Sequence, residues 1–367
     1  TFAPFEDGVI ITQFENKQFK REINIPEQIG EMKVVAIGIN CFANQSNLTK
    51  ITLPNSIRDI RDYAFRKCTG IKEFVTGEGY IRAGSDAFEG AFAEGGTLYL
   101  NCDTNLRDVA GDIYPFRLSN LENVVVGSKV ENIGKTFTFA QRLKSVEFGK
   151  NVKTIGYEAF RGCKQLETVN LPDGLERIDD YAFLSCEKLG NLTIPSSVVS
   201  IGIAAFRECN GGNIQIPEDN MIKSLGTDAF RFSEMAGKLI FSNKVNIGET
   251  AFESVSGVDT VSVTHPESVV GWWAFRGFNG VDGGFDLTVG YNYIEEGTFQ
   301  YATLKSVQIL DGVKNIAREA FGECRNLQTI TVPDTVETVD RSAFYNFPHI
   351  DYNGSLEGAP WGADALN

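Results

Sequence analysis

The sequence predicts a β-rich repeat solenoid, a fold in which short coils of similar sequence stack along one axis. The clearest coils begin at Ile155, Ile178 and Ile201, so each starts 23 residues after the one before. Phenylalanine and cysteine return at the same offsets in all three coils, and proline does so in the first two. A fixed period of this length is typical of solenoids, because one coil cannot bury its apolar face without its neighbours.

A repeated phenylalanine marks how far the array extends. Most of these anchors are 22–24 residues apart, which predicts about 14 coils of about 23 residues each. The one long gap, from Phe88 to Phe116, predicts an irregular insertion over residues 89–116. The anchors are Phe42, Phe65, Phe88, Phe116, Phe137, Phe160, Phe183, Phe206, Phe230, Phe252, Phe275, Phe299, Phe321 and Phe344.

Each coil is expected to be mainly β. In the coil that begins at Ile155, Val169 and Leu171 should face inward from a short strand, because alternate side chains of a strand share a face. Pro172 has no N–H to donate, so it ends that strand. A second short extended piece follows, and the Ala–Phe–x–x–Cys corner is expected to form one helical or 3₁₀ turn.

Both ends of the array are predicted to be caps. Residues 1–41 precede the first anchor and alternate apolar and polar residues in the manner of short strands. We expect them to cover the open apolar end of the solenoid, which is assigned to residues 42–349. Residues 350–367 break the period and include Trp361, so they are predicted to form the C-terminal cap.

The seven cysteines are predicted to be buried thiols. Five of them follow an anchor phenylalanine by three residues, and Cys41 directly precedes Phe42. Strands of neighbouring coils lie about 4.7–4.9 Å apart, which is too far for an S–S bond of about 2.05 Å. Cysteines placed by the repeat therefore fit a column of small apolar side chains better than a set of disulfides.

Three stretches carry a resemblance to a known family. They are IGYEAFRGCKQLETVNLP (155–172), IDDYAFLSCEKLGNLTIP (178–195) and IAREAFGECRNLQTITVP (316–333). With the repeat spelled out, the chain resembles the leucine-rich repeats named after the bacterial surface antigen BspA, also called the Treponema pallidum class. The resemblance implies a leucine-rich-repeat arc that is secreted or attached to the cell surface, often an adhesin, and not an enzyme.

Composition narrows the range of partners. The chain has 34 basic and 48 acidic residues, for a net charge of −14. An acidic chain without basic clusters argues against nucleic acid and against anionic membranes as partners. No stretch approaches the roughly 18–20 consecutive apolar residues of a membrane span. The chain opens at Thr1 without a signal peptide, and the surface hypothesis assumes that an export signal has been removed.

The sequence offers little for catalysis or metal binding. Its two histidines, His265 and His349, are far apart and fall in turns, so neither makes a persuasive base for a nucleophile. Zinc and calcium motifs are missing, and the glycine-rich pieces lack the strand-to-helix context of a phosphate loop. We therefore expect a protein that is not an enzyme and has no catalytic residue, metal or cofactor.

Recognition remains, and two groups of residues are candidates for it. The first is the outward-facing strand positions, which are polar and nearly uncharged. Those chosen are Thr168, Asn170, Asn191, Thr193, Asn213 and Gln215. The second is an excess of aromatic residues around one corner, which contains Trp272, Trp273, Phe278, Tyr291 and Tyr293. Packing between neighbouring corners is the competing interpretation of these aromatic residues.

Three functions remain open at this point. The preferred hypothesis is an extracellular or surface-displayed adhesin that binds a macromolecule, such as a host-matrix protein or another cell-surface protein. The second is a surface protein that binds a glycan through the cluster at Trp272 and Trp273. The third is a structural spacer with no ligand of its own.

Overall fold

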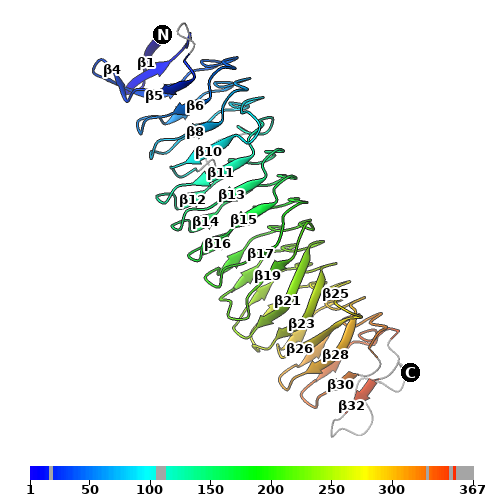
Figure 1. Ribbon diagram of the computed structural model, residues 1–367. Helices are drawn as coiled ribbons and strands as arrows, with labels where there is room; N and C mark the ends of the chain where they lie inside the picture. Colours follow the sequence, from blue (N-terminus) through cyan, green and yellow to red (C-terminus); the bar gives the residue numbers. More distant parts are fainter. Residues whose placement is uncertain (16–19, 105–112, 328–329, 347–349, 353–367) are drawn as a thin grey trace. The chain divides into compact units, whose positions relative to one another are not determined.

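The computed structural model describes residues 1–15, 20–104, 113–327, 330–346 and 350–352. It divides into two compact units. Unit 1 comprises Thr1–Leu175 and Tyr181–Gly190, and unit 2 comprises Glu176–Asp180 and Asn191–Asn367. Within each unit the short strands of successive coils lie side by side (Figure 1). The fold class expected from the sequence, a repeat solenoid of about 14 coils, is confirmed.

Unit 1 contains a parallel sheet of seven strands, which we call its first sheet. Its order is β15-β13-β11-β10-β8-β6-β3. The strands are β3 (Glu22–Asn24), β6 (Lys50–Thr52), β8 (Glu73–Val75), β10 (Thr97–Leu100), β11 (Asn123–Val126), β13 (Ser145–Glu147) and β15 (Thr168–Asn170). Strand β10 lies inside the irregular stretch 89–116, so that stretch still supplies one strand in register with its neighbours.

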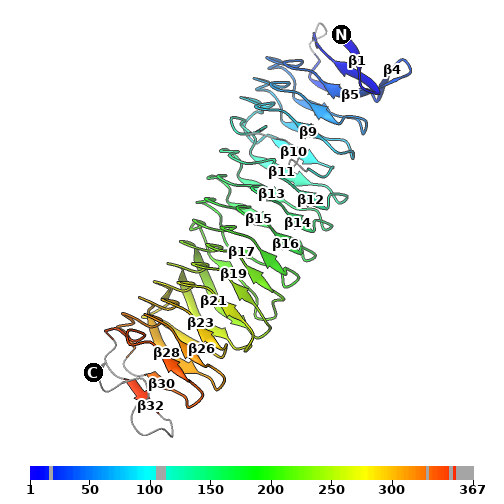
Figure 2. The same ribbon diagram turned by 180° about the vertical axis from the view of Figure 1, so that it is seen from behind.

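The second strands of the coils of unit 1 form separate ladders. One has the order β1-β2-β5-β7-β9, with β4 beside β5, and β12 pairs with β14 farther along the chain. Strands β12 and β14 lie beside β13 and β15 in both views (Figure 1, Figure 2). The strands are β1 (Phe2–Phe5), β2 (Gly8–Ile11), β4 (Gln28–Ile29), β5 (Met32–Ile37), β7 (Asp59–Ile60), β9 (Arg82–Ala83), β12 (Asn132–Ile133) and β14 (Thr154–Ile155).

Unit 2 has a longer first sheet, of nine strands. Its order is β17-β19-β21-β23-β26-β28-β30-β32, with β25 beside β23. The strands are β17 (Leu192–Thr193), β19 (Ile214–Gln215), β21 (Glu234–Phe241), β23 (Ser256–Val263), β25 (Asn279–Gly280), β26 (Phe285–Val289), β28 (Leu304–Ile309), β30 (Ile330–Val332) and β32 (Ile350–Tyr352).

The second strands of unit 2 form two parallel ladders, β16-β18-β20-β22-β24 and β27-β29-β31. Each strand is two residues long, and the second residue faces the interior. The strands are β16 (Arg177–Ile178), β18 (Ser200–Ile201), β20 (Ser224–Leu225), β22 (Asn246–Ile247), β24 (Val269–Val270), β27 (Tyr293–Ile294), β29 (Asn315–Ile316) and β31 (Thr338–Val339).

The anchor phenylalanines form a stacked column in the core of each unit. In unit 1 the rings of Phe160 and Phe183 lie 5.3 Å apart with 12° between their planes. In unit 2 the rings of Phe230 and Phe252 lie 5.4 Å apart at 1°. Each ring fills the inside of its own coil and contacts the next ring, so the column joins neighbouring coils.

The corner that carries the anchor is not the helical or 3₁₀ turn expected from the sequence, and the described residues contain no helix. Tyr63 and Lys67, on either side of Phe65, both have φ of 56°. A left-handed residue at both positions prevents a right-handed turn from continuing. The amides of Phe65 and Lys67 instead donate to the carbonyls of Ala87 and Glu89 in the next coil, at 2.8 and 2.7 Å.

The cysteine column is confirmed. All seven cysteine side chains are buried thiols, and the described residues contain no disulfide. The thiol of Cys68 donates to the carbonyl of Phe42 at 3.0 Å, and that of Cys163 donates to the carbonyl of Phe137 at 3.1 Å. The cysteine therefore fills a small apolar site and also links its coil to the preceding one.

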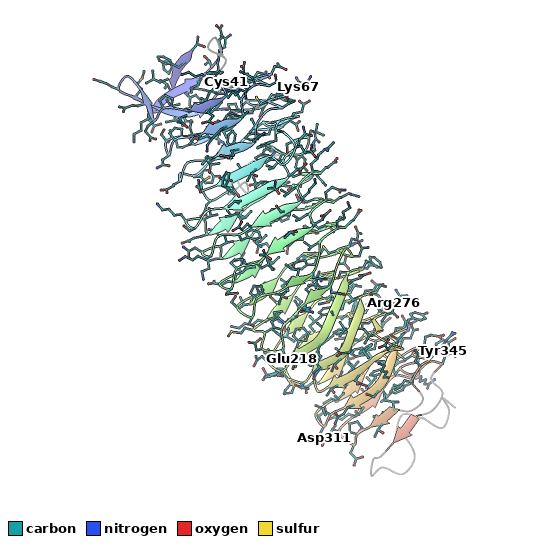
Figure 3. All side chains as sticks on the ribbon, viewed as in Figure 1. Cys41, Lys67, Glu218, Arg276, Asp311 and Tyr345 are labelled. Carbon is teal, nitrogen blue, oxygen red and sulfur yellow. The ribbon has the colours of Figure 1, made fainter. Side chains whose placement is uncertain are left out.

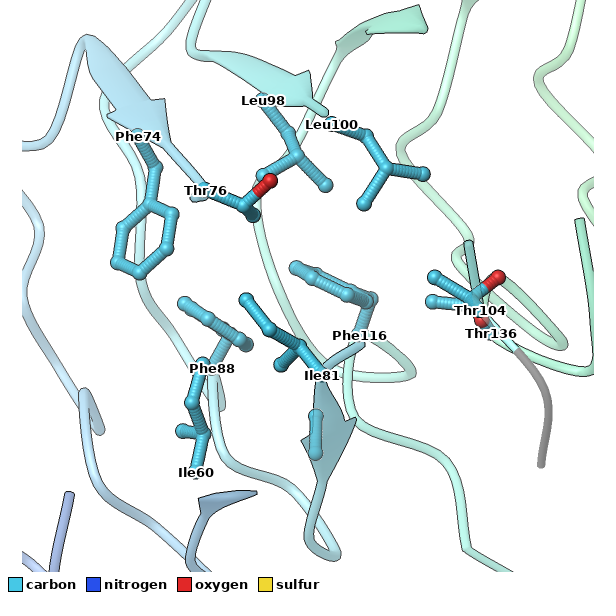
Figure 4. Close-up of a pocket in the computed structure, with 11 residues that line it drawn as sticks. Ile60, Phe74, Thr76, Ile81, Phe88, Leu98, Leu100, Thr104, Phe116 and Thr136 are labelled. Atoms are coloured by element: carbon cyan, nitrogen blue, oxygen red, sulfur yellow. The ribbon is translucent and has the colours of Figure 1, made fainter. Parts of the chain in front are cut away.

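A small cavity lies in the core of unit 1, next to the irregular stretch (Figure 4). Phe74, Leu98, Leu100 and Phe116 line it, and its volume is about 30 Å³. One water needs roughly 10–15 Å³, whereas pockets for small-molecule ligands occupy about 300–1,000 Å³. The cavity is therefore a local packing gap and not a ligand site.

The sequence predicts a cap at each end of the array, over residues 1–41 and 350–367. Residues 1–37 carry β1 to β5, and β1 pairs with β2 antiparallel, unlike the parallel coils that follow. Of the predicted C-terminal cap, 350–367, only β32 lies within the described residues. No helix able to cross a membrane occurs among the residues that the structure describes.

Candidate recognition sites

The first sheet of unit 1 presents two outward columns of side chains, because alternate residues of every strand face the same side. One column includes Ser145 and Thr168, which are paired in register, and the other includes Glu147 and Asn170. Thr168 and Asn170 are both exposed, while Val169 between them is buried. The two predicted candidates on β15 therefore face solvent.

The predicted candidates of unit 2 also face solvent. Thr193 pairs with Gln215, and Asn191 and Asn213 precede their strands directly. All four side chains are exposed. The side-chain oxygen of Asn191 accepts a hydrogen bond from the amide of Asn213 at 2.9 Å. This asparagine therefore supports the backbone of the next coil and is only partly available to a partner.

A short apolar strip on the first sheet of unit 1 was missed at the level of sequence. Val75, Tyr99 and Val125 are paired in register on β8, β10 and β11, and all three side chains are half-buried. We call these three residues the Tyr99 strip. Tyr99 lies in the irregular stretch where the period is blurred, although the alternation of Leu98, Tyr99 and Leu100 does indicate an outward tyrosine.

An ion pair lies beside the Tyr99 strip. Lys50 Nζ is 2.7 Å from Glu73 Oε2, and the two residues are paired in register in the neighbouring outward column. The hydrogen bond that Lys50 donates to Glu73 raises the pKa of Lys50. This arrangement, an aromatic residue between two valines with charges at the side, differs from the uncharged Thr and Asn face expected for the whole sheet.

Two residues of the predicted aromatic cluster, Trp272 and Tyr293, line a groove beside β27, β29 and β31. Its volume is about 480 Å³. Trp272 and Tyr293, whose side chains are 52% and 47% exposed, come from neighbouring coils. We call it the Trp272 groove, and its further lining includes Glu296, Asn315, Arg318, Thr338 and Asp340.

Trp272 is held in place from two sides. Its indole N–H donates to Glu295 Oε2 at 3.1 Å. Its ring meets that of Trp273 edge to face, with centroids 6.3 Å apart. Trp273 in turn packs on Gly297, where an added Cβ would lie 2.3 Å from the indole Cδ1. The half-buried Trp273 is therefore a support, and Trp272 is the ring presented to solvent.

The rest of the lining combines three apolar residues with polar ones, and three of its four charged residues are acidic. Thr338 donates a hydrogen bond to the side-chain oxygen of Asn315. The backbone amide and hydroxyl of Ser342 donate to Asp340, and these bonds lower the pKa of its carboxyl group. Asp340 is therefore ionised at neutral pH, and Arg318 supplies the positive charge in the lining.

Comparison with known families identifies the repeat. The sequence model of the family described as "BspA type Leucine rich repeat region (6 copies)" matches residues 9–106, 112–236, 185–291 and 292–353. The chain belongs to this family. The match extends over most of the chain and includes the irregular stretch 89–116 except for residues 107–111.

One of the solved structures similar to this BspA-type protein shows the same fold. A leucine-rich repeat protein from Bacteroides ovatus matches with a TM-score of 0.64 and 22% identity, over 96% of this chain and 86% of that one. A leucine rich cell surface protein from Faecalibacterium prausnitzii matches at 23% identity, over 96% and 93% of the two chains, with a TM-score of 0.42. Among curated proteins, no relative matches this chain.

Two of the predicted contact residues of this BspA-type protein cannot reach a partner. Phe278 and Tyr291 are fully buried. Phe278 occupies the slot that cysteine fills in other coils, three residues after Phe275, and its ring packs 4.9 Å from that of Phe285. Tyr291 stands three residues before Ile294, as Leu175 does before Ile178. Both are core residues, because the position within the repeat, and not the residue type, determines whether the side chain is buried.

Replacement of Tyr291 by phenylalanine is expected to stabilise the protein. The tyrosine hydroxyl is buried and has no hydrogen-bond partner among the described residues, and burial raises its pKa. Removing an unsatisfied buried polar group should raise the free energy of unfolding by about 1–3 kcal/mol, as measured by urea denaturation. Tyr293→Phe, at an exposed site, serves as the control and should change stability by less than about 0.5 kcal/mol.

A chain of ion pairs along the corner of unit 2 was also missed. Arg207 lies 2.9 Å from Asp228, which in turn lies 3.5 Å from Arg231. Glu253 joins Arg231, at 2.8 Å, to Arg276, at 3.4 Å. Arg276 marks this edge in Figure 3. The signal was an arginine directly after the anchor in several coils, and these shared carboxylates support neighbouring corners.

The two histidines and possible metal-binding clusters are the remaining candidates for catalysis or metal binding. His265 accepts a hydrogen bond through Nδ1 from the backbone amide of Glu267, 3.2 Å away, in a turn. His349 lies outside the described residues. Within the described ranges, no group of three or more His, Cys, Asp and Glu side chains is placed to hold a metal ion.

Proposed function

We propose that this BspA-type protein is a non-enzymatic adhesin, secreted or displayed on the cell surface, that binds a protein partner. The Tyr99 strip is the observation that carries the proposal. Tyrosine is enriched among the residues that dominate binding energy in protein interfaces, and such residues lie within less critical polar contacts. Tyr99 is an outward-facing tyrosine between two valines, on a sheet whose other outward residues are polar.

The form of the sheet supports the same function. Strands in register hold their outward side chains at fixed positions, so little conformational entropy is lost when a partner binds. The exposed Thr and Asn positions, such as Thr168 and Asn170, extend the face on one side of the strip. The net charge of −14 favours a partner with a basic surface and disfavours nucleic acid. The expected partner is a host-matrix protein or another cell-surface protein.

Membership of the family supports the proposed location. The repeats are named after a bacterial surface antigen, and the family resemblance implies export. Detection of the protein by antibody on intact, unpermeabilised cells would test the location. Retention in the cytosol of its native host would contradict it.

Tyr99→Ala is expected to weaken binding of the protein partner tenfold or more, because truncation of such an anchor costs about 2 kcal/mol or more and about 1.4 kcal/mol is tenfold. Surface plasmon resonance against a panel of immobilised extracellular-matrix and cell-surface proteins provides the measurement. Tyr80→Ala removes an exposed tyrosine of the same unit that lies outside the first sheet, and it should leave affinity nearly unchanged. Equal affinities for wild type and Tyr99→Ala would refute the role of the strip, and no saturable binding to any protein would favour the spacer hypothesis.

A further inference from the structure

We propose that the Trp272 groove of unit 2 is a separate binding site for a neutral saccharide. This inference extends the proposed recognition function to a second ligand class and a second site. The groove combines two half-exposed aromatic rings with a polar wall, and both rings lie among the more exposed large side chains of the protein. Exposed aromatic residues beside polar groups mark sites for ligands that have both apolar and hydrogen-bonding faces.

The two rings fit the apolar face of a sugar. A pyranose ring presents C–H groups on its faces and hydroxyl groups around its edge. Trp272 and Tyr293 offer flat surfaces from neighbouring coils on one side of the groove. The groove volume of about 480 Å³ lies within the range of about 300–1,000 Å³ that is usual for small-molecule sites.

The platform is held rigid before any ligand arrives. Glu295 accepts the indole N–H of Trp272, and Trp273 supports the ring from behind. Gly297 is required under Trp273, because a side chain there would collide with the indole. A ring that is already immobilised loses little freedom on binding, so stacking contributes more of its energy to affinity.

The polar residues in register with Tyr293, and others of the lining, supply hydrogen bonds for the hydroxyl groups. Asn315 and Thr338 carry groups that both donate and accept, Arg318 only donates and the ionised Asp340 only accepts. A sugar hydroxyl can both donate and accept, so it can use every one of these partners. A purely apolar ligand would leave them unpaired, and that would cost binding energy.

The charge of the groove selects among saccharides. Three carboxylates, those of Glu295, Glu296 and Asp340, line it beside a single guanidinium, that of Arg318. Arg318 is also paired with Glu319 at 3.2 Å. The local potential is therefore negative and disfavours sialylated, uronic-acid or sulfated sugars. Neutral hexoses and N-acetylhexosamines fit both the rings and the charge.

The test is a glycan array that carries neutral hexose and N-acetylhexosamine oligosaccharides beside sialylated and sulfated ones. Wild type is expected to bind neutral glycans in preference to acidic ones. Trp272→Ala and Tyr293→Ala should each reduce that binding at least tenfold. Tyr301→Ala is the matched control, because Tyr301 is 50% exposed in the same unit but does not line the groove. Its binding should equal that of wild type.

Thermal melts establish that each variant is folded, and Tyr293→Ala keeps the test valid if Trp272→Ala does not fold. The proposal is overturned if no neutral glycan binds, if acidic glycans bind better, or if both groove variants bind like wild type. A protein partner that depends on Trp272 while glycans do not would also overturn it. Tyr99→Ala should retain glycan binding, so failure of the adhesin proposal and failure of this one give different results.

Discussion

Phe230→Ala is expected to lower the free energy of unfolding by about 3–5 kcal/mol, the usual cost of removing a fully buried phenylalanine. The ring is fully buried and stacks on Phe206 at 5.3 Å and on Phe252 at 5.4 Å. Truncation therefore leaves a cavity and also interrupts the contact between three successive coils. Urea denaturation followed by circular dichroism measures the change.

The matched control is Phe232→Ala, two residues farther along the same corner. Phe232 is 41% exposed, and its ring lies under the guanidinium of Arg231 at 4.7 Å. Its removal should cost no more than about 1 kcal/mol, the value of an exposed cation–π contact. If the two substitutions destabilise the protein equally, the anchor column is not the main source of contact between coils.

Raising the pH above about 9 is expected to destabilise the protein steeply. Burial raises the thiol pKa to about 12 for Cys41, Cys68 and Cys324 and to about 11 for Cys102, and it raises the pKa of Cys163 as well. In the unfolded chain a cysteine has a pKa of about 8.5. Between these values the unfolded state has lost protons that the folded state keeps, so the free energy of unfolding falls as pH rises.

The size of the effect follows from the number of thiols. Each loses about 1.4 kcal/mol of stability per pH unit in this window, so several together approach the roughly 5–15 kcal/mol that stabilises a typical domain. Thermal melts between pH 7 and 11 measure the slope. Cys68→Ala should make it shallower by about 1.4 kcal/mol per pH unit. Rapid alkylation of the thiols at pH 8.5 in a fully folded sample would contradict the prediction.

The repeat could be predicted because the same residue types return at the same positions of each coil. A buried ring such as Phe160 and a thiol such as Cys163 return at fixed offsets, and each is required wherever a coil meets its neighbour. The backbone of the corner could not be predicted in this way. Tyr63 and Trp273 both have positive φ although their side chains give no sign of it. Hydrogen bonds to the next coil impose that conformation, and local propensity does not encode them.

At the candidate sites, the position within the repeat and the residue type lead to different expectations of whether a side chain is buried. Phe278 and Tyr291 are aromatic, but they occupy core slots and are buried. Trp272 and Tyr293 occupy variable slots and are exposed. The position of each residue within the repeat could therefore have predicted that the first two are buried and the last two exposed. Tyr99 is the opposite case, because the period is blurred in its coil and only the alternation within its strand places it outward.

The corner hydrogen bonds give the corner of each unit, though not its strands, an electrical direction. At Tyr63, Phe65 and Lys67 the N–H groups all point toward the following coil, and the same arrangement recurs at Phe230 and Phe252. A peptide group has a dipole of about 3.5 D, and dipoles that point the same way add. Each corner therefore carries its positive end toward later coils, whereas an α-helix is positive toward its N-terminus. A strip of oriented peptide groups accordingly runs along the corner of each unit, and its uncompensated charge lies only at the ends of the strip, because these N–H groups each meet a carbonyl of the next coil.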